Sequence, residues 1–189
     1  MNQKLFTWFA IFLFIICVCC SRESNNTPLQ QKGKSQSSVL QLLQQIDSLN
    51  DLGEYNSVIV KDYITNAEMF CNAYPEDPLA AEFLYKAGLM AMTLAKATDS
   101  LEETELYSQK ALTIFDNILM IYPDFNGVKN CILNKGVIYD DILHDYENAE
   151  IIYSEFIASY PTDTLAINLE SYLKYLGKSP EEIIVMFGK

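Results

Sequence analysis

Apolar residues recur every three or four positions along most of the chain after residue 37, which is the spacing of one face of an α-helix. Glycine and proline number only 7 and 6 among 189 residues, and they concentrate at the apparent junctions between apolar runs. We therefore predict an all-α fold built from helical hairpins. Three hairpins end before Pro75, Pro123 and Pro161, and two shorter helices follow.

Each of these three hairpins ends on a tyrosine followed by a proline, a residue that cannot continue a helix. Further positions coincide when they are counted back from the three prolines. An apolar residue recurs five positions before every proline, and an alanine recurs twelve positions before the last two: Phe70, Ile118 and Phe156; Ala111 and Ala149. Because Tyr74, Tyr122 and Tyr160 occupy one equivalent position, we expect these tyrosines to pack in the core and not to bind a ligand.

The last hairpin resembles the tetratricopeptide repeat family, whose unit is a helix–turn–helix of about 34 residues. Gly136, Ala149, Tyr153, Phe156 and Pro161 carry this resemblance. The same pattern occurs in the preceding unit: Gly88, Ala111, Phe115, Ile118 and Pro123. The resemblance covers about residues 38–176, and it implies a right-handed superhelical stack of about three hairpins with C-terminal capping helices.

The chain departs from the family pattern at several points. The interval from Gly136 to Ala149 is one residue longer than the family norm, and the interval from Gly88 to Ala111 is eleven longer. Lys135 stands where the family has an apolar residue, and the first unit lacks both the glycine and the central alanine. We therefore expect the second hairpin to have longer helices or a longer turn.

Several residues mark helix ends. Asp77 and Pro78, an N-cap and a first-turn proline, predict the start of the first helix of the second hairpin. Ser100, followed by Glu103, predicts the start of the return helix of the second hairpin, and His144-Asp145 predicts the turn of the third. Gly177 suits a left-handed helix end. Ser179, Pro180 and Glu182 combine an N-cap, a first-turn proline and a capping-box acid, which predicts a last short helix.

The first residues resemble the signal of a bacterial lipoprotein. Residues 1–19 hold Lys4 and an apolar stretch too short to span a membrane, and the chain turns polar directly after Cys20. Cys20 is the expected lipidation site because the small Cys19 precedes it; Cys19 itself and an uncleaved N-terminal anchor are the alternatives. Residues 20–37 are then the lipidated cysteine and a flexible tether, and residues 38–189 the repeat domain.

The chain is acidic, with a net charge of −12 at pH 7. An acidic surface repels the phosphate backbone, so we expect no nucleic-acid partner. The sequence also indicates no catalytic residue, no metal site and no cofactor. His144 is the only histidine, Cys71 and Cys131 lie within helices, and Asp140-Asp141 with His144 lacks further ligands.

An interaction surface is the remaining candidate site. In the family that the chain resembles, partners commonly bind the face formed by the first helix of each hairpin. Setting Gly88 and Gly136 as equivalents places the candidate partner-binding residues on that face: Tyr85, Leu89, Met92, Leu133, Asn134 and Val137. The same equivalence places Asp140 on this face. Tyr85, Leu89 and Met92 are the expected anchors for a peptide or a partner helix.

The resemblance implies a non-enzymatic scaffold that joins other proteins of the bacterial cell envelope, for example in outer-membrane protein assembly. We expect the chain to be held at the outer membrane by its N-terminal lipid and to face the periplasm. One alternative is a periplasmic or surface lipoprotein that binds a peptide or glycan, which predicts a ligand-sized aromatic pocket. The other is a regulatory subunit of an envelope enzyme.

Overall fold

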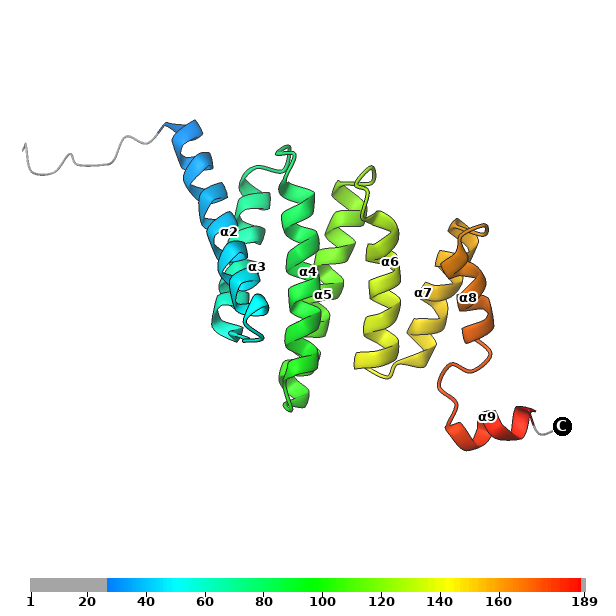
Figure 1. Ribbon diagram of the computed structural model, residues 1–189. Coiled ribbons are helices and arrows are strands. Elements are labelled where there is room, and N and C mark those ends of the chain that lie inside the picture. The colour runs from blue at the N-terminus through cyan, green and yellow to red at the C-terminus, as the bar shows by residue number, and fades with distance from the viewer. Residues whose placement is uncertain (1–26, 188–189) are drawn as a thin grey trace, which may run out of the picture. The chain divides into compact units, whose positions relative to one another are not determined.

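The computed structural model describes residues 27–187, so the predicted signal segment and Cys20 lie outside the described residues. The chain divides into two units, residues 1–34 and residues 35–189. Every regular element in the described part is helical, which confirms the predicted all-α class (Figure 1). The elements are α2 (Pro28–Asp51), α3 (Ser57–Ala73), α4 (Ala80–Ala97), α5 (Leu101–Ile121), α6 (Val128–Val137), the π-helical segment η1 (Ile138–Ile142), α7 (Tyr146–Ser159), α8 (Thr164–Tyr172) and α9 (Pro180–Phe187).

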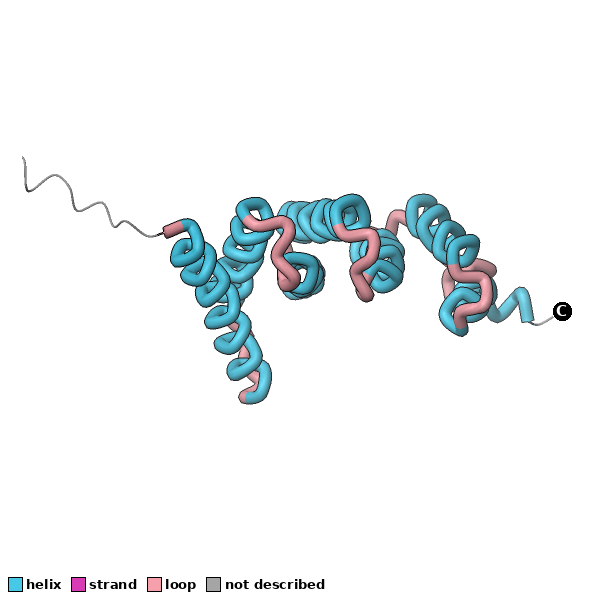
Figure 2. Tube along the Cα trace, turned by 90° about the horizontal axis from the view of Figure 1, so that it is seen from above, coloured by secondary structure: helices cyan, strands magenta, loops and turns pink. Residues whose placement is uncertain are grey.

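From α3 to α8 the helices pack in two layers. Helices α4, α6 and α8 lie on one side, and α3, α5 and α7 lie on the other (Figures 1 and 2). The core between the layers includes Phe70, Phe115 and Phe156, the first two of them in one continuous cluster that runs from Val39 to Ile138. Each fully buried aromatic ring of this kind stabilises the fold by about 1.5–3 kcal/mol.

The three tyrosine–proline turns have one geometry. Each tyrosine follows the last helical residue with φ between −137° and −124° and ψ between 53° and 59°. Each tyrosine N–H donates to the carbonyl four residues earlier, at 2.8–2.9 Å, and each tyrosine carbonyl accepts from the N–H three residues later, at 2.9–3.0 Å. These backbone angles lie outside the α-helical region, which a following proline disfavours. The three tyrosines are therefore equivalent in geometry, as the sequence predicted. The expectation that they pack inside the core is only partly met, because all three are half-buried at its edge.

Gly88 of α4 and Gly136 of α6 each lie against an aromatic ring of the next helix. A Cβ on Gly88 would stand 2.6 Å from a ring carbon of Phe115, and a Cβ on Gly136 would stand 2.3 Å from a ring carbon of Tyr153. Any side chain at these positions would push the ring away. The glycines therefore allow α4 to approach α5, and α6 to approach α7, in the same register.

The two departures in spacing have different structural outcomes. The second hairpin has longer helices, 18 residues in α4 and 21 in α5, against 14 in α7. The single extra residue after Gly136 coincides with η1, where the Leu143 N–H donates to the Ile138 carbonyl five residues earlier, at 2.9 Å. A π-helical turn accommodates one residue more than an α-helical turn and keeps the flanking helix in place.

Two helices begin at residues other than those expected. Helix α2 begins at Pro28, inside the segment predicted to be a flexible tether, because Thr27 and Gln30 cap it reciprocally at 3.0 and 3.3 Å. Helix α4 was expected to begin at Pro78. It begins at Ala80, because the Asp77 carboxylate accepts from the Leu79 N–H at 2.9 Å and holds a turn there.

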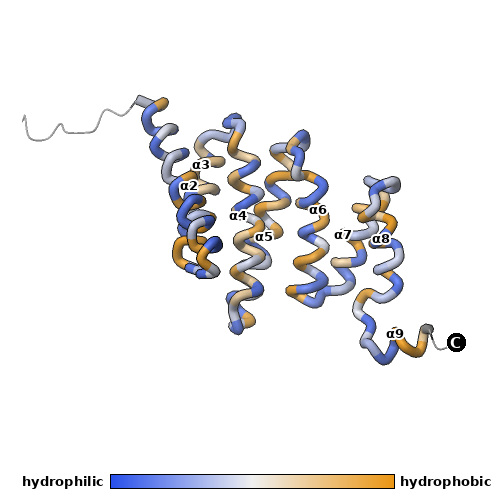
Figure 3. Tube along the Cα trace, viewed as in Figure 1, coloured by the Kyte–Doolittle hydropathy of each residue, from blue (hydrophilic) through white to orange (hydrophobic). Residues whose placement is uncertain are grey.

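The other predicted helix starts are present. Ser100 and Asp145 accept from the backbone N–H groups three residues later, at 3.4 and 3.2 Å. Ser179 and Glu182 form a reciprocal capping box at 2.7 and 3.2 Å. Gly177 has the expected left-handed φ of +68°, but α8 ends five residues before it, at Tyr172. The final helix α9 is hydrophobic over its last turn, where Ile184, Val185 and Met186 are exposed (Figure 3).

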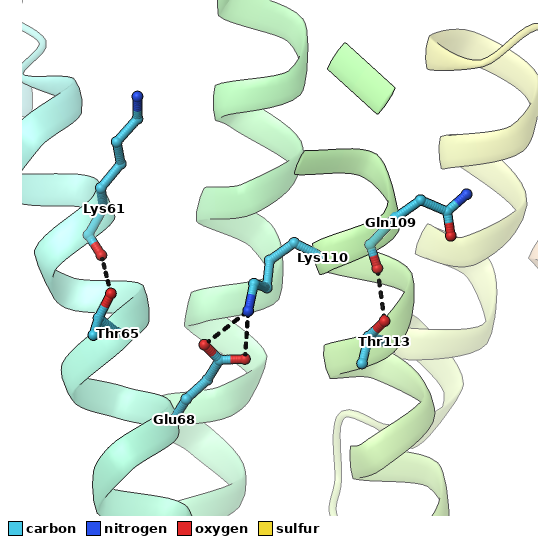
Figure 4. Close-up of polar contacts among 6 residues, drawn as sticks. All are labelled: Lys61, Thr65, Glu68, Gln109, Lys110 and Thr113. Carbon is cyan, nitrogen blue, oxygen red and sulfur yellow. Dashed lines mark hydrogen bonds and ion pairs between the residues drawn. The ribbon is translucent and has the colours of Figure 1, made fainter. Parts of the chain in front are cut away.

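Ion pairs link neighbouring hairpins at their surface. The Lys110 ammonium of α5 lies 3.1 Å from both carboxylate oxygens of Glu68 on α3 (Figure 4). Lys135, at the site where the repeat family has an apolar residue, pairs with Asp116 of α5 at 2.5 Å. Part-exposed pairs of this kind contribute up to about 1 kcal/mol each.

Candidate functional site

The predicted partner-binding residues of α4 are anchored in the fold to different degrees. The Tyr85 ring lies 6.2 Å from the Phe115 ring and 5.8 Å from the Phe125 ring, so it is partly covered by aromatic neighbours. Leu89 is half-buried against the core, and Met92 is only 9% exposed. The accessible part of this helix face is therefore centred on Tyr85 and Leu89.

The predicted residues of α6 lie in the same layer as those of α4 (Figure 2). Leu133 and Asn134 are half-exposed, and Val137 is half-buried against the core. Leu133 stands at the position of Tyr85 when both are counted from the preceding prolines. We name the surface formed by Tyr85, Leu89, Leu133 and Asn134 the α4–α6 face.

Asp140 leaves this face and forms a buried polar cluster. Its side chain is only 6% exposed, and one carboxylate oxygen accepts from the Tyr172 hydroxyl at 2.6 Å and from the Tyr153 hydroxyl at 3.2 Å. Burial, with the negative charge of Asp140, raises the pKa of both tyrosines, so both hydroxyls keep their protons and donate. The cluster joins η1, α7 and α8.

The side chains of Asp140, Asp141 and His144, which the sequence places near one another as metal-ligating types, do not point to one common site. Asp141 is exposed and lies 3.6 Å from the Lys96 ammonium of α4. His144 sits in the turn with φ of 52°, and its Nδ1 lies 3.1 Å from the Asp140 carbonyl. Among residues 27–187, no three side chains of the metal-ligating types lie together.

The two cysteines of the described chain are free and buried. Burial raises the pKa of the Cys71 and Cys131 thiols to about 12. A thiol attacks as its thiolate, so at neutral pH these two side chains act as small apolar core residues.

A cleft of about 350 Å³ lies between the first two tyrosine–proline turns. Its lining consists of three prolines, three acids, two aromatic residues and two aliphatic residues: Pro75, Glu76, Asp77, Pro78, Ala81, Ile121, Tyr122, Pro123, Asp124 and Phe125. Burial raises the pKa of Tyr122, with contributions from Cys71 and Glu76, so this hydroxyl is neutral. Sequence reasoning missed the cleft, since its residues come from two turns far apart along the chain.

No protein-family model, no curated protein and no solved structure matches this chain. Among the described helices, none combines the length and the hydropathy needed to cross a bilayer. The fold therefore defines the chain as an all-α protein of antiparallel helices, with three turns of equal geometry.

Proposed function

We propose that this chain is a membrane-tethered, non-enzymatic adaptor of the tetratricopeptide-repeat type, which binds other proteins of the bacterial cell envelope through its α4–α6 face. The observation that carries the repeat assignment is the glycine–aromatic contact that recurs between Gly88 and Phe115 and between Gly136 and Tyr153. Two hairpins that share this contact and the turn geometry also share a register. Their first helices then present equivalent residues on one surface.

The composition of the α4–α6 face supports a role in protein binding. Its accessible residues are an aromatic, two aliphatic and one amide side chain, Tyr85, Leu89, Leu133 and Asn134, which is the mixture found at protein interfaces. The nearby ionisable groups are already engaged in the fold: Lys86 pairs with Glu82 at 3.8 Å, and Asp140 holds two tyrosine hydroxyls. This face is better suited to docking than to proton transfer.

The membrane tether is the second part of the proposal. Cys20 would carry the lipid, and the chain would be held at the outer membrane on its periplasmic side. The resemblance of residues 1–20 to a lipoprotein signal supports this. A tethered adaptor needs no spanning helix of its own, because several acyl chains acting together hold a protein at the bilayer.

The experiment is site-specific photocrosslinking in intact bacteria, with a photoreactive amino acid in place of Leu133. The matched control carries it in place of Ile151, an aliphatic residue of α7 that is 49% exposed on the opposite layer. We expect a discrete protein crosslink from position 133 and none from position 151. Cys20→Ala is expected to release the chain from the membrane fraction and to weaken the crosslink. Equal crosslinks from both positions, or none from position 133, would contradict the proposed face.

A further inference from the structure

Consecutive tyrosine–proline turns are joined differently in the two halves of the described chain. Lys129, six residues after the second proline, donates to the Asp163 carboxylate, two residues after the third proline, at 2.6 Å. This contact lowers the pKa of Asp163. The equivalent positions in the first pair of turns hold Ala81 and Phe125.

Ala81 and Phe125 both line the cleft of about 350 Å³. The first pair of turns thus has an open volume where the second pair has a lysine side chain and its carboxylate partner. The lining includes the acids Glu76, Asp77 and Asp124, and none of its ten residues is basic. The cleft therefore combines negative charge with the space that Lys129 fills in the next pair of turns.

The wall of the cleft suits an alkyl chain that ends in a cation. Tyr122 and Phe125 supply aromatic rings, and the cationic group of a side chain is attracted to the face of such a ring. Pro75, Pro78 and Pro123 supply apolar contacts for the methylene groups. The volume is at the small end of the range for ligand pockets, about 300–1,000 Å³, which fits one side chain better than an extended ligand.

We infer that this cleft binds a lysine side chain of a protein partner, with its ammonium group in the place that Lys129 takes in the following pair of turns. The internal ion pair supplies the template, and the net charge of −12 favours the approach of a basic segment. The inference rests on the proposed function, since it specifies one chemical feature of the protein partner.

The direct test is an NMR titration of the full chain in detergent micelles. The probes are acetyl-Gly-Lys-Gly-amide and the same peptide with norleucine in place of lysine. We expect the lysine peptide to shift the Phe125 and Tyr122 amide signals and to bind at least about fivefold more tightly than the norleucine peptide. Equal binding of the two peptides, or no shift at these signals, would overturn the inference.

Variants then locate the binding. Ala81→Lys should fill the cleft with a side chain of the protein itself and weaken the binding of the lysine peptide by about fivefold or more. The double variant Glu76→Gln/Asp124→Asn, which keeps the shape of the cleft, should weaken it similarly. The charge-matched control, Glu150→Gln/Glu155→Gln, removes two exposed acids from α7 and should leave binding unchanged. An equal loss in this control would mean general attraction to an acidic protein and would refute the site.

Other occupants give distinct results. If n-butylamine binds as tightly as the lysine peptide, the cleft is a site for free amines and the partner assignment fails. If Ala81→Lys instead abolishes a self-association of the chain, the occupant is a second copy. The photocrosslink at position 133 is independent of the cleft residues, so failure of the cleft and failure of the α4–α6 face are separable.

Discussion

The α4–α5 and α6–α7 hairpins share a register, but they differ at two equivalent positions. Both positions are apolar in the first hairpin and polar in the second. Four residues after the glycine, the first has Met92 and the second has Asp140. Eight residues before the proline, the first has Phe115 and the second has Tyr153. All four side chains are buried. An apolar pair in one hairpin is thus replaced by a hydrogen-bonded pair in the other.

This difference shows that both positions have to change together. A carboxylate in the place of Met92 would be buried without a donor, and a buried polar group that lacks a partner costs about 1–3 kcal/mol. In the α6–α7 hairpin the Tyr153 hydroxyl supplies the donor at 3.2 Å, and Tyr172 of α8 supplies a second at 2.6 Å. The hydrogen bonds thereby join α8 to the hairpin in one orientation. Apolar contacts are not directional and would not fix that orientation.

The largest expected effect comes from removing one partner of the hydrogen-bonded pair of Asp140 and Tyr153. Asp140→Ala leaves the buried Tyr153 hydroxyl without its acceptor, and we expect it to lower the free energy of unfolding by about 2–3 kcal/mol. Asp140→Met with Tyr153→Phe, which copies the α4–α5 hairpin, should cost less than the sum of the two single changes, because both polar groups leave together. Urea unfolding followed by circular dichroism measures the unchanged chain, Asp140→Ala, Asp140→Met, Tyr153→Phe and the double variant. Additive losses would mean that the two residues are not coupled.

A smaller effect is expected at the glycines. Alanine is favoured over glycine within a helix by about 1 kcal/mol, but its Cβ would displace the ring of Phe115 or of Tyr153. Displacing Tyr153 also stretches its hydrogen bond to Asp140. Gly136→Ala should therefore destabilise the chain by about 1 kcal/mol more than Gly88→Ala. Urea unfolding of both variants measures this difference, and it should vanish in a Tyr153→Phe background; an equal cost in the original background would show that the hydrogen bond plays no part.

The helix ends and the register could be predicted from the sequence because they depend on local rules. A proline excludes helical geometry at the residue before it, and Ser100 and Asp145 satisfy N–H groups within their own first turns. Repetition of one pattern then related distant segments. For the same reason the repeat pattern assigns the glycine and the aromatic ring of each hairpin to one repeat unit, although it does not show that they are in contact.

The polar cluster and the cleft could not be predicted in this way. Asp140 was expected near the α4–α6 face, but the π-helical segment η1 carries it, and its second partner, Tyr172, lies 32 residues further along the chain. The extra residue between Gly136 and Ala149 was visible as a spacing anomaly, yet nothing local showed that the anomaly would fall at a buried carboxylate. The cleft depends on Ala81 and Phe125 from separate turns, and only their three-dimensional positions bring them together.

The smallest expected effect is a dependence of stability on pH. Burial and Asp140 raise the pKa of Tyr153 and Tyr172 above the ordinary value of about 10. Below pH 10 both hydroxyls are protonated in the folded and the unfolded chain, so their contribution to stability is fully present. Above about pH 10 the unfolded chain loses these protons first, which favours unfolding. We expect each hydroxyl to lower the free energy of unfolding by under about 1 kcal/mol at about pH 10.5, as measured by urea unfolding at a series of pH values.

The control for this pH dependence is the double variant Tyr153→Phe/Tyr172→Phe. Burial also raises the pKa of other groups, Tyr55, Tyr63, Tyr122, Cys71 and Cys131, so the unchanged chain loses stability at alkaline pH from more than one source. The difference between the two proteins isolates the Tyr153 and Tyr172 hydroxyls, because the other groups are common to both. This difference should be constant from about pH 7 to 9 and decrease above about pH 10. A difference that stays constant through pH 10 would show that the two hydroxyls ionise equally easily in the folded and unfolded chain, and that the buried carboxylate does not hold their protons.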